Sequence, residues 1–181
     1  HISDFAGYDH MLFLVALCAI YSIQQWKSIL VLVTAFTIGH SVTLVLSSLD
    51  IFNIPSSIVE FLIPVTIFLT AINNVFGANL SGQKTKMSRN YLMALFFGFI
   101  HGMGFSNYFK ALIMDSSSVL MPLFGFNLGI EIGQILVVFI IVSIAYLFLN
   151  KLNVKRRDWS LFISGAAAGM ALIFIMENKI W

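Results

Sequence analysis

The stretch LFGFNLGIEIGQ, residues 123–134, decides the fold class. It lies inside an apolar run from about residue 119 to 149, long enough to cross a bilayer as a helix. Wound as a helix, the stretch has two opposite faces. Gly125, Gly129 and Gly133 form one, which would let a neighbouring helix approach closely, and Asn127, Glu131 and Gln134 form the other. A carboxylate in hydrocarbon costs at least ~2.5 kcal/mol, so Glu131 needs an ion, water, a proton or a protein partner.

Composition places the whole chain in a membrane. Of its 181 residues, 59% are hydrophobic and 10% charged, and the mean hydropathy is +0.94. Soluble domains do not have this composition. The length predicts one domain over residues 1–181, and the small formal charge of +2 gives no reason to expect a nucleic-acid partner. Cys18 is the only cysteine, which excludes a disulfide framework and a thiolate metal cluster.

The order of apolar runs and polar breaks predicts an all-α polytopic membrane protein, a bundle of six transmembrane helices. The predicted spans are residues 9–24, 27–48, 56–76, 90–109, 119–149 and 159–177. Lys and Arg are concentrated in the first, third and fifth loops, which predicts that these loops are cytoplasmic and both termini extracytoplasmic. The expected location is the plasma membrane, the inner membrane of a bacterium.

In this topology the membrane-embedded ionisable residues lie at one depth. Counting along the spans places His40, Glu60, His101 and Glu131 roughly 5–18 Å below the outer interface, near Asp9 and His10. Imidazoles with carboxylates suit a divalent transition metal such as Ni, Zn, Cu, Co, Fe or Mn, and the residues do not choose among these. The shared depth therefore predicts a metal site in the outer half of the bilayer.

Each residue also has a reading without a metal. Asp9 and His10 could be an interfacial helix cap, and Glu60 could be solvated at a helix mouth. His40 and His101 could hydrogen-bond neighbouring helices, and a protonated Glu131 could do the same. These readings would have to place several costly groups at one depth independently, so the metal site is the stronger interpretation.

Five stretches resemble the hydrogenase/urease accessory membrane protein family of the HupE/UreJ type. They are GYDH at 7–10, FTIGHSVTL at 36–44, VEFLIP at 59–64, FGFIHGMGF at 97–105 and FNLGIEIGQ at 126–134. Proteins of that family are described as nickel or cobalt permeases. The resemblance implies metal handling by Asp9 and His10, together with His1.

The sequence differs from the nickel branch of that family at two places. His1 stands further from the Asp9–His10 pair than the first histidine of that branch does. Gly104, Phe105 and Ser106 occupy the positions where that branch has a second histidine and a glutamate. The chain therefore resembles a divergent branch.

The expected function is binding of a divalent transition metal by a permease. The expected ligands are Asp9, His10, His40, His101 and Glu131, with Glu60 and His1 as further candidates, and Thr37, Ser41, Asn127 and Gln134 orienting them. One alternative is an intramembrane metalloenzyme of hydrolase type that opens outward and uses Glu60 or Glu131 as general base. A second is a structural or assembly factor. The expected partners are the lipid bilayer, the metal ion and a second copy packed through the glycine-rich helix faces.

Overall fold

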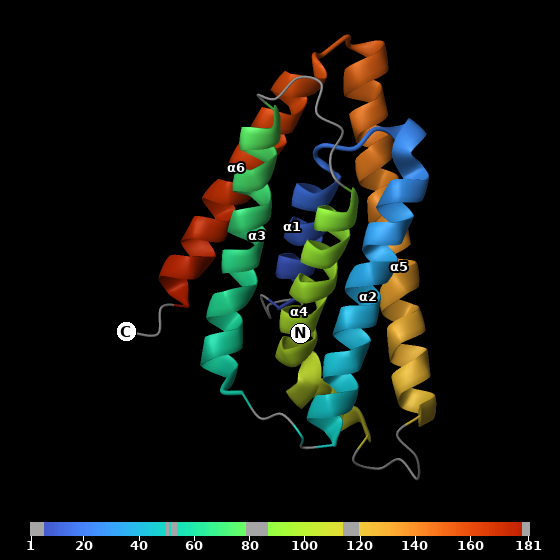
Figure 1. Ribbon diagram of the computed structural model, residues 1–181, viewed down its shortest axis with the longest axis vertical. Helices are drawn as coiled ribbons and strands as arrows, with labels where there is room; N and C mark the ends of the chain where they lie inside the picture. Colours follow the sequence, from blue (N-terminus) through green and yellow to red (C-terminus); the bar gives the residue numbers. More distant parts are fainter. Residues whose placement is uncertain (1–5, 50, 52–53, 79–86, 114–119, 179–181) are drawn as a thin grey trace.

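The computed structural model describes residues 6–49, 51, 54–78, 87–113 and 120–178, and every regular element in these ranges is helical (Figure 1). The helices are α1 (Ala6–Cys18), η1 (Ile23–Gln25), α2 (Trp26–Ser48), α3 (Ser56–Ala78), α4 (Met87–Ile113), α5 (Leu120–Tyr146), η2 (Leu147–Lys151) and α6 (Arg156–Glu177). The short η1 is a 3-10 turn, and η2 is a π-helical turn that prolongs α5. The all-α prediction is confirmed, and His1 lies outside the described residues.

Four helical stretches of the described residues are long and apolar enough to cross a membrane. They are Ile23–Ser47, Ser56–Gly77, Met121–Lys151 and Arg156–Glu177. In addition, Tyr8–Cys18 in α1 is a shorter apolar helix. The long helix α4 does not meet the same criterion within the described part of the chain. The described ranges thus contain six main helices, four of which qualify as spans by length and composition.

The first helix is shorter than the predicted span over residues 9–24. It ends at Cys18, and backbone bonds from Ala19 to Ala16 and from Tyr21 to Cys18 close its last turn. A new turn then begins at Ser22, whose N–H donates to the side chain of Gln25 at 3.2 Å while the Gln25 N–H donates to the Ser22 carbonyl at 2.8 Å. This reciprocal cap restarts the chain as a separate element, which a hydropathy count does not detect.

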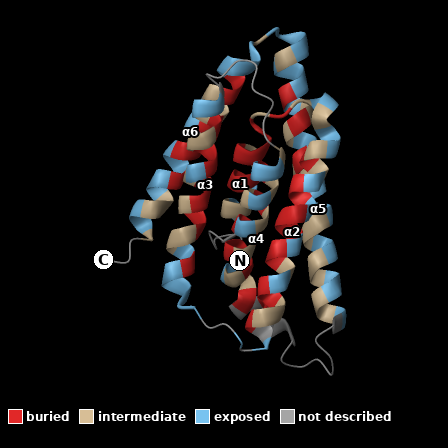
Figure 2. Cartoon of the chain, in the orientation of Figure 1, coloured by how far each residue is buried: buried red, intermediate tan, exposed pale blue. Residues whose placement is uncertain are grey.

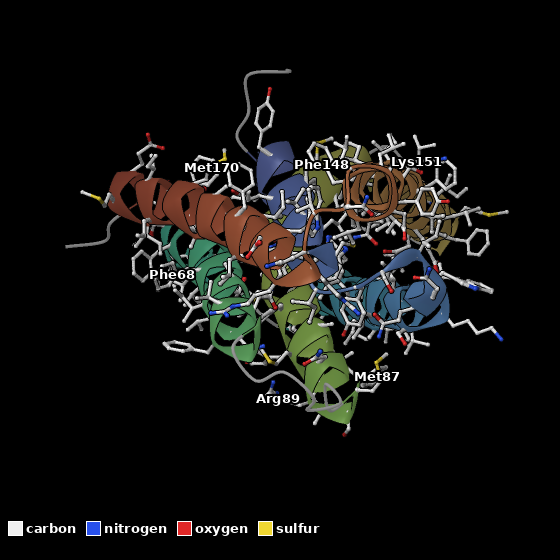
Figure 3. All side chains as sticks on the ribbon, turned by 90° about the horizontal axis from the view of Figure 1, so that it is seen from above. Phe68, Met87, Arg89, Phe148, Lys151 and Met170 are labelled. Carbon is white, nitrogen blue, oxygen red and sulfur yellow. The ribbon has the colours of Figure 1, made fainter. Side chains whose placement is uncertain are left out.

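The short helix α1 is the centre of the bundle. Seen end-on, it lies between the α3–α6 pair and the α2–α5 pair (Figure 3), and it contacts α3, α5 and α6. The most extensive helix pairs are α2 with α4 and α3 with α6. Burial follows this arrangement, because α1 and the inward faces of α2 and α4 are buried while α5 is largely exposed (Figure 2). The helix that carries Glu131 is therefore peripheral.

The connections α1–α2, α3–α4 and α5–α6 join helix ends on the same side of the bundle (Figure 1). We call this side the basic end, because Lys27, Arg89, Lys151 and Arg156 lie there. The guanidinium of Arg156 donates to the Ile20 carbonyl and to the Gln25 side chain, both at 2.6 Å. This arginine thus ties the start of α6 to the turn that follows α1.

Candidate metal site at three imidazoles

Glycines bring α2 and α4 into backbone contact. A Cβ atom added to Gly39 would meet the carbonyl oxygen of Leu95, and one added to Gly98 would meet that of Phe36. A Cβ atom on Gly102 would meet the backbone of His40. Close approach of this kind is what small residues permit between membrane helices. Gly98 and Gly102 of α4 thus pack closely against the backbone of α2.

The crossing of α2 and α4 buries two histidines, and α1 supplies a third. His40 and His101 are both 0% exposed, and each follows or precedes one of the crossing glycines in the sequence. The ring centroid of His10 lies 5.7 Å from that of His40 and 4.9 Å from that of His101. Three helices therefore contribute three imidazoles, and the His10 ring lies close to both of the others.

Aromatic rings enclose these imidazoles. The His10 ring makes edge contacts with Phe36 at 5.7 Å and with Phe105 at 5.0 Å between centroids. Phe13 lies 5.3 Å from His101, and Phe126 of α5 lies 6.4 Å from His40. This apolar wall keeps the local dielectric low, which strengthens electrostatic interactions at the imidazole nitrogens and raises the cost of leaving them unpaired.

One hydrogen bond fixes the state of His101. Its Nδ1 lies 2.8 Å from the carbonyl oxygen of Phe97, and because a carbonyl can only accept, Nδ1 carries the proton. The Nε2 atom of a neutral ring then has a free lone pair. This Nε2 is buried and has no hydrogen-bond partner among the described residues. A backbone carbonyl behind one nitrogen with the other left open is the usual arrangement of a metal-ligating histidine.

His40 has no such support in the described part of the chain. Both of its ring nitrogens are buried and unpartnered there. Leaving a buried polar group without a partner costs roughly 1–3 kcal/mol, so an unpartnered imidazole in a closely packed crossing needs an explanation. A ligand that binds between the rings supplies one.

The distances from the His10 ring to the other two rings can be compared with those around a metal ion. If each imidazole contributes a nitrogen ~2.1 Å from a tetrahedral ion, the ring centroids stand ~5 Å apart. The observed 4.9 and 5.7 Å are close to this value. However, no set of three His, Cys, Asp or Glu side chains within the described ranges is arranged to hold a metal ion.

The predicted carboxylates occupy different places. Asp9 is half-buried in the first turn of α1, next to His10 in sequence, where a negative charge also complements the helix dipole. Glu60 is exposed on α3. Glu131 lies in a groove between α2 and α5 whose lining includes neither His40 nor His101. The structure therefore brings together the three described histidines and leaves Glu131 apart from them.

The groove between α2 and α5 is a second polar system. The Thr34 hydroxyl donates to the Glu131 carboxylate at 3.3 Å, and the Thr37 hydroxyl lies 3.0 Å from the Gln134 side-chain oxygen. Thr34, Ser41, Asn127 and Glu131 all line the groove. These contacts hold α5 against α2 by hydrogen bonds inside the membrane-facing part of the bundle.

Four residues expected to orient the ligands bond elsewhere. The Ser41 hydroxyl donates to the Thr37 carbonyl at 2.7 Å, and Thr37 is 3.1 Å from the Val33 carbonyl as well as bonding Gln134. The Asn127 amide donates to the Leu123 carbonyl at 3.0 Å. None of these bonds reaches an imidazole.

The glycine face of α5 points away from the rest of the bundle. Gly125, Gly129 and Gly133 are exposed, and an added Cβ atom at any of them would meet nothing within 4 Å. Gly165 and Gly169 of α6 are equally open. The close helix packing expected at the three glycines of α5 is therefore not formed within the described part of the chain.

Sequence reasoning missed the aromatic enclosure, although a signal was present. Phe36 precedes His40 by four residues, and Phe97 precedes His101 by four residues, so the pattern F-x-x-x-H occurs twice. On a helix this spacing places the aromatic ring or its carbonyl one turn from the imidazole. Phe13 and Phe126 come from other helices and carry no comparable signal.

The comparisons with known proteins agree with the motifs. A family model described as HupE / UreJ protein matches residues 1–178. No curated protein and no solved structure matches the chain. The match spans nearly the whole sequence and includes every helix of the structure, His10, His40 and His101 among its residues. The chain is thus a membrane protein that belongs to the HupE/UreJ family.

Proposed function

We propose that this protein is a permease for a divalent transition-metal ion, with His10, His40 and His101 as the binding site for that ion. The observation that carries the proposal is the meeting of three imidazoles from three helices in an apolar enclosure, with buried nitrogens of His40 and His101 unpartnered. Polar groups this costly persist in a membrane protein where they serve a substrate or an ion.

The donor set selects the class of ion. Neutral imidazole nitrogens suit Ni, Zn, Cu, Co, Fe and Mn in their divalent states, and sulfur ligands are missing from the described site. Three neutral rings leave the full double charge of the ion uncompensated. Asp9 is the carboxylate next to His10 along α1 and is our candidate for partial neutralisation. Glu131 takes no part in this ligand set.

The distribution of basic residues supports an orientation. Lys27, Arg89, Lys151 and Arg156 lie at the basic end, which we assign to the cytoplasm by the positive-inside rule. With this assignment we propose a six-helix membrane domain in the plasma membrane of a bacterium, with both termini outside. His10 and His40 then lie toward the outer side, where an ion would enter.

The alternative of an intramembrane metalloenzyme assigns the role of general base to Glu60 or Glu131. Glu131 belongs to the separate α2–α5 groove, and Glu60 is exposed on α3. Neither observation favours the enzyme. A structural or assembly factor would not explain why buried nitrogens of His40 and His101 have no hydrogen-bond partner among the described residues.

Zinc uptake into vesicles tests the proposal. Purified protein reconstituted into liposomes that enclose a zinc indicator should admit Zn²⁺, and the same assay should be repeated with Ni²⁺ and Co²⁺. His40→Ala should abolish uptake, whereas Ser164→Ala, which alters a buried side chain of α6, should preserve it. Stoichiometric binding without flux under any pH or potential gradient would favour the enzyme, and failure to bind any metal would favour the assembly factor.

A further inference from the structure

A second cavity lies inside the bundle, toward the basic end. Five polar residues line it, and four of them are more than nine-tenths buried. They are Tyr21, Thr70, Asn73, Asn74 and Asn90, of which Asn73 is partly exposed. Tyr21 follows α1, the two asparagines at 73 and 74 lie near the end of α3, and Asn90 is in the first turn of α4. All of these positions are near the basic end.

Two phenylalanines separate this cavity from the imidazoles. Phe13 and Phe97 line the cavity, and their ring centroids are 6.1 Å apart. Phe13 is also 5.3 Å from the His101 ring, and the Phe97 carbonyl accepts the His101 hydrogen bond. The partition between the two polar regions is therefore one layer of side chains thick.

The hydrogen bonds of the cavity leave oxygen atoms available. Asn74 donates through its amide nitrogen to the Ala16 carbonyl at 2.6 Å, and Asn90 donates through its nitrogen to the Tyr21 hydroxyl at 2.8 Å. Each amide thus keeps its oxygen as an acceptor. The cavity has a volume of ≈ 20 Å³, which is enough for about one water molecule.

We propose, on the basis of the permease function above, that this cavity is the inner half of the ion pathway and that Phe13 and Phe97 form the gate between its halves. The ligand is the same divalent ion, met here by neutral amide and hydroxyl oxygens. Oxygen donors without charge hold a transition metal more weakly than imidazole nitrogens do. A strong site followed by a weak one lets an ion enter and then leave.

Thiol accessibility tests the pathway without any metal. In a Cys18→Ala background, Asn73→Cys should react with a small charged methanethiosulfonate reagent added from the basic end and be protected from the opposite side. Adding Phe97→Ala should make the reaction from the opposite side at least tenfold faster. Phe96→Ala is the matched control, because Phe96 is the neighbouring ring and is 59% exposed. Phe97→Leu repeats the test if the alanine variant does not fold.

Two results would overturn the inference. One is an Asn73→Cys side chain that reacts from neither side, and the other is a Phe97→Ala variant that behaves like Phe96→Ala.

Zinc measurements then separate this inference from the permease assignment. Asn73→Leu should lower Zn²⁺ flux at least tenfold while equilibrium Zn²⁺ binding changes by less than twofold. Unchanged flux through Asn73→Leu in a wild type that transports would refute the inner pathway alone, whereas a wild type without flux would refute the permease assignment.

Discussion

Gly98 of α4 lies directly against the carbonyl group of Phe36 in α2, with no room for a methyl group between them. Backbone atoms cannot move aside as a flexible side chain can, so Gly98→Ala must push the two helices apart. Overpacking of this kind costs typically 1–3 kcal/mol. We expect a lower thermal denaturation midpoint in detergent and weaker zinc binding, because the same crossing holds His40 and His101.

Gly125→Ala is the control for that variant. It makes the same chemical change within the membrane-facing helix α5, where an added Cβ atom meets nothing within 4 Å. Its denaturation midpoint should equal or exceed that of the wild type, since alanine favours a helix over glycine. If Gly98→Ala and Gly125→Ala lowered the denaturation midpoint equally, the α2–α4 crossing would not be more tightly packed than the exposed face of α5.

The tautomer of His101 leads to a prediction about affinity. His101→Gln removes an imidazole nitrogen that the Phe97 carbonyl already aligns. Losing a group that merely supports a metal ligand lowers metal affinity by about 10- to 100-fold. Losing the ligand itself should therefore lower zinc affinity by more than about 100-fold. Gln134→Ala should change it by less than about threefold, because Gln134 bonds Thr37 in the other groove. Isothermal titration with Zn²⁺ in detergent measures both. Similar losses in the two variants would contradict a site limited to the three rings.

Removing the charge of Asp9 should weaken zinc binding much more than removing the charge of Glu131. Asp9→Asn removes the charge next to His10, and we expect zinc affinity to fall by at least about tenfold. Glu131→Gln keeps an acceptor for the Thr34 hydroxyl and lies outside the imidazole enclosure, so affinity should stay within about twofold. Titrations of the two variants at one pH compare them directly. A larger effect at Glu131 than at Asp9 would reverse the assignment of the charge-compensating group.

Orientation can be checked by labelling single cysteines in intact cells. Leu152→Cys lies between η2 and α6 at the basic end, and Ser57→Cys lies at the start of α3 on the opposite side; both positions are exposed. In a Cys18→Ala background, an impermeant maleimide should label Ser57→Cys and leave Leu152→Cys unlabelled until the cells are opened. The reverse pattern would invert the topology and place the imidazoles toward the cytoplasm.

Much of the fold and part of the site could be predicted from the sequence. Long apolar runs dictate membrane helices, and the positions of five of the six helices lie close to the predicted spans. Depth along a helix is a simple count, and it predicts one level for His10, His40 and His101; the rings of His40 and His101 lie 5.7 and 4.9 Å from that of His10 in the structure. The end of α1 at Cys18 could not be found by hydropathy, because the apolar run continues through residues 19–21 before the new turn at Ser22.

Direction around the helix axis was harder to predict than depth. The sequence shows that Glu131 and the glycines lie on opposite faces of α5 but not which face meets the bundle. Two hydrogen bonds to Thr34 and Thr37 of α2 favour the polar face, so the carboxylate turns into its own groove and the glycines turn outward. Which face of α5 meets the bundle depends on the residues that α2 presents to it. The periodicity of α5 alone therefore cannot predict that face.

The short central helix has a consequence for the membranes in which this protein can work. With 13 residues, α1 is ~20 Å long, well below the ~30 Å of a bilayer core. Because other helices largely enclose it, its ends need not match the lipid. Changes in bilayer thickness, through acyl-chain length or sterol-like lipids, would tilt the peripheral helices α5 and α6 first. The imidazoles carried by α1, α2 and α4 should therefore keep their spacing across membranes of different thickness.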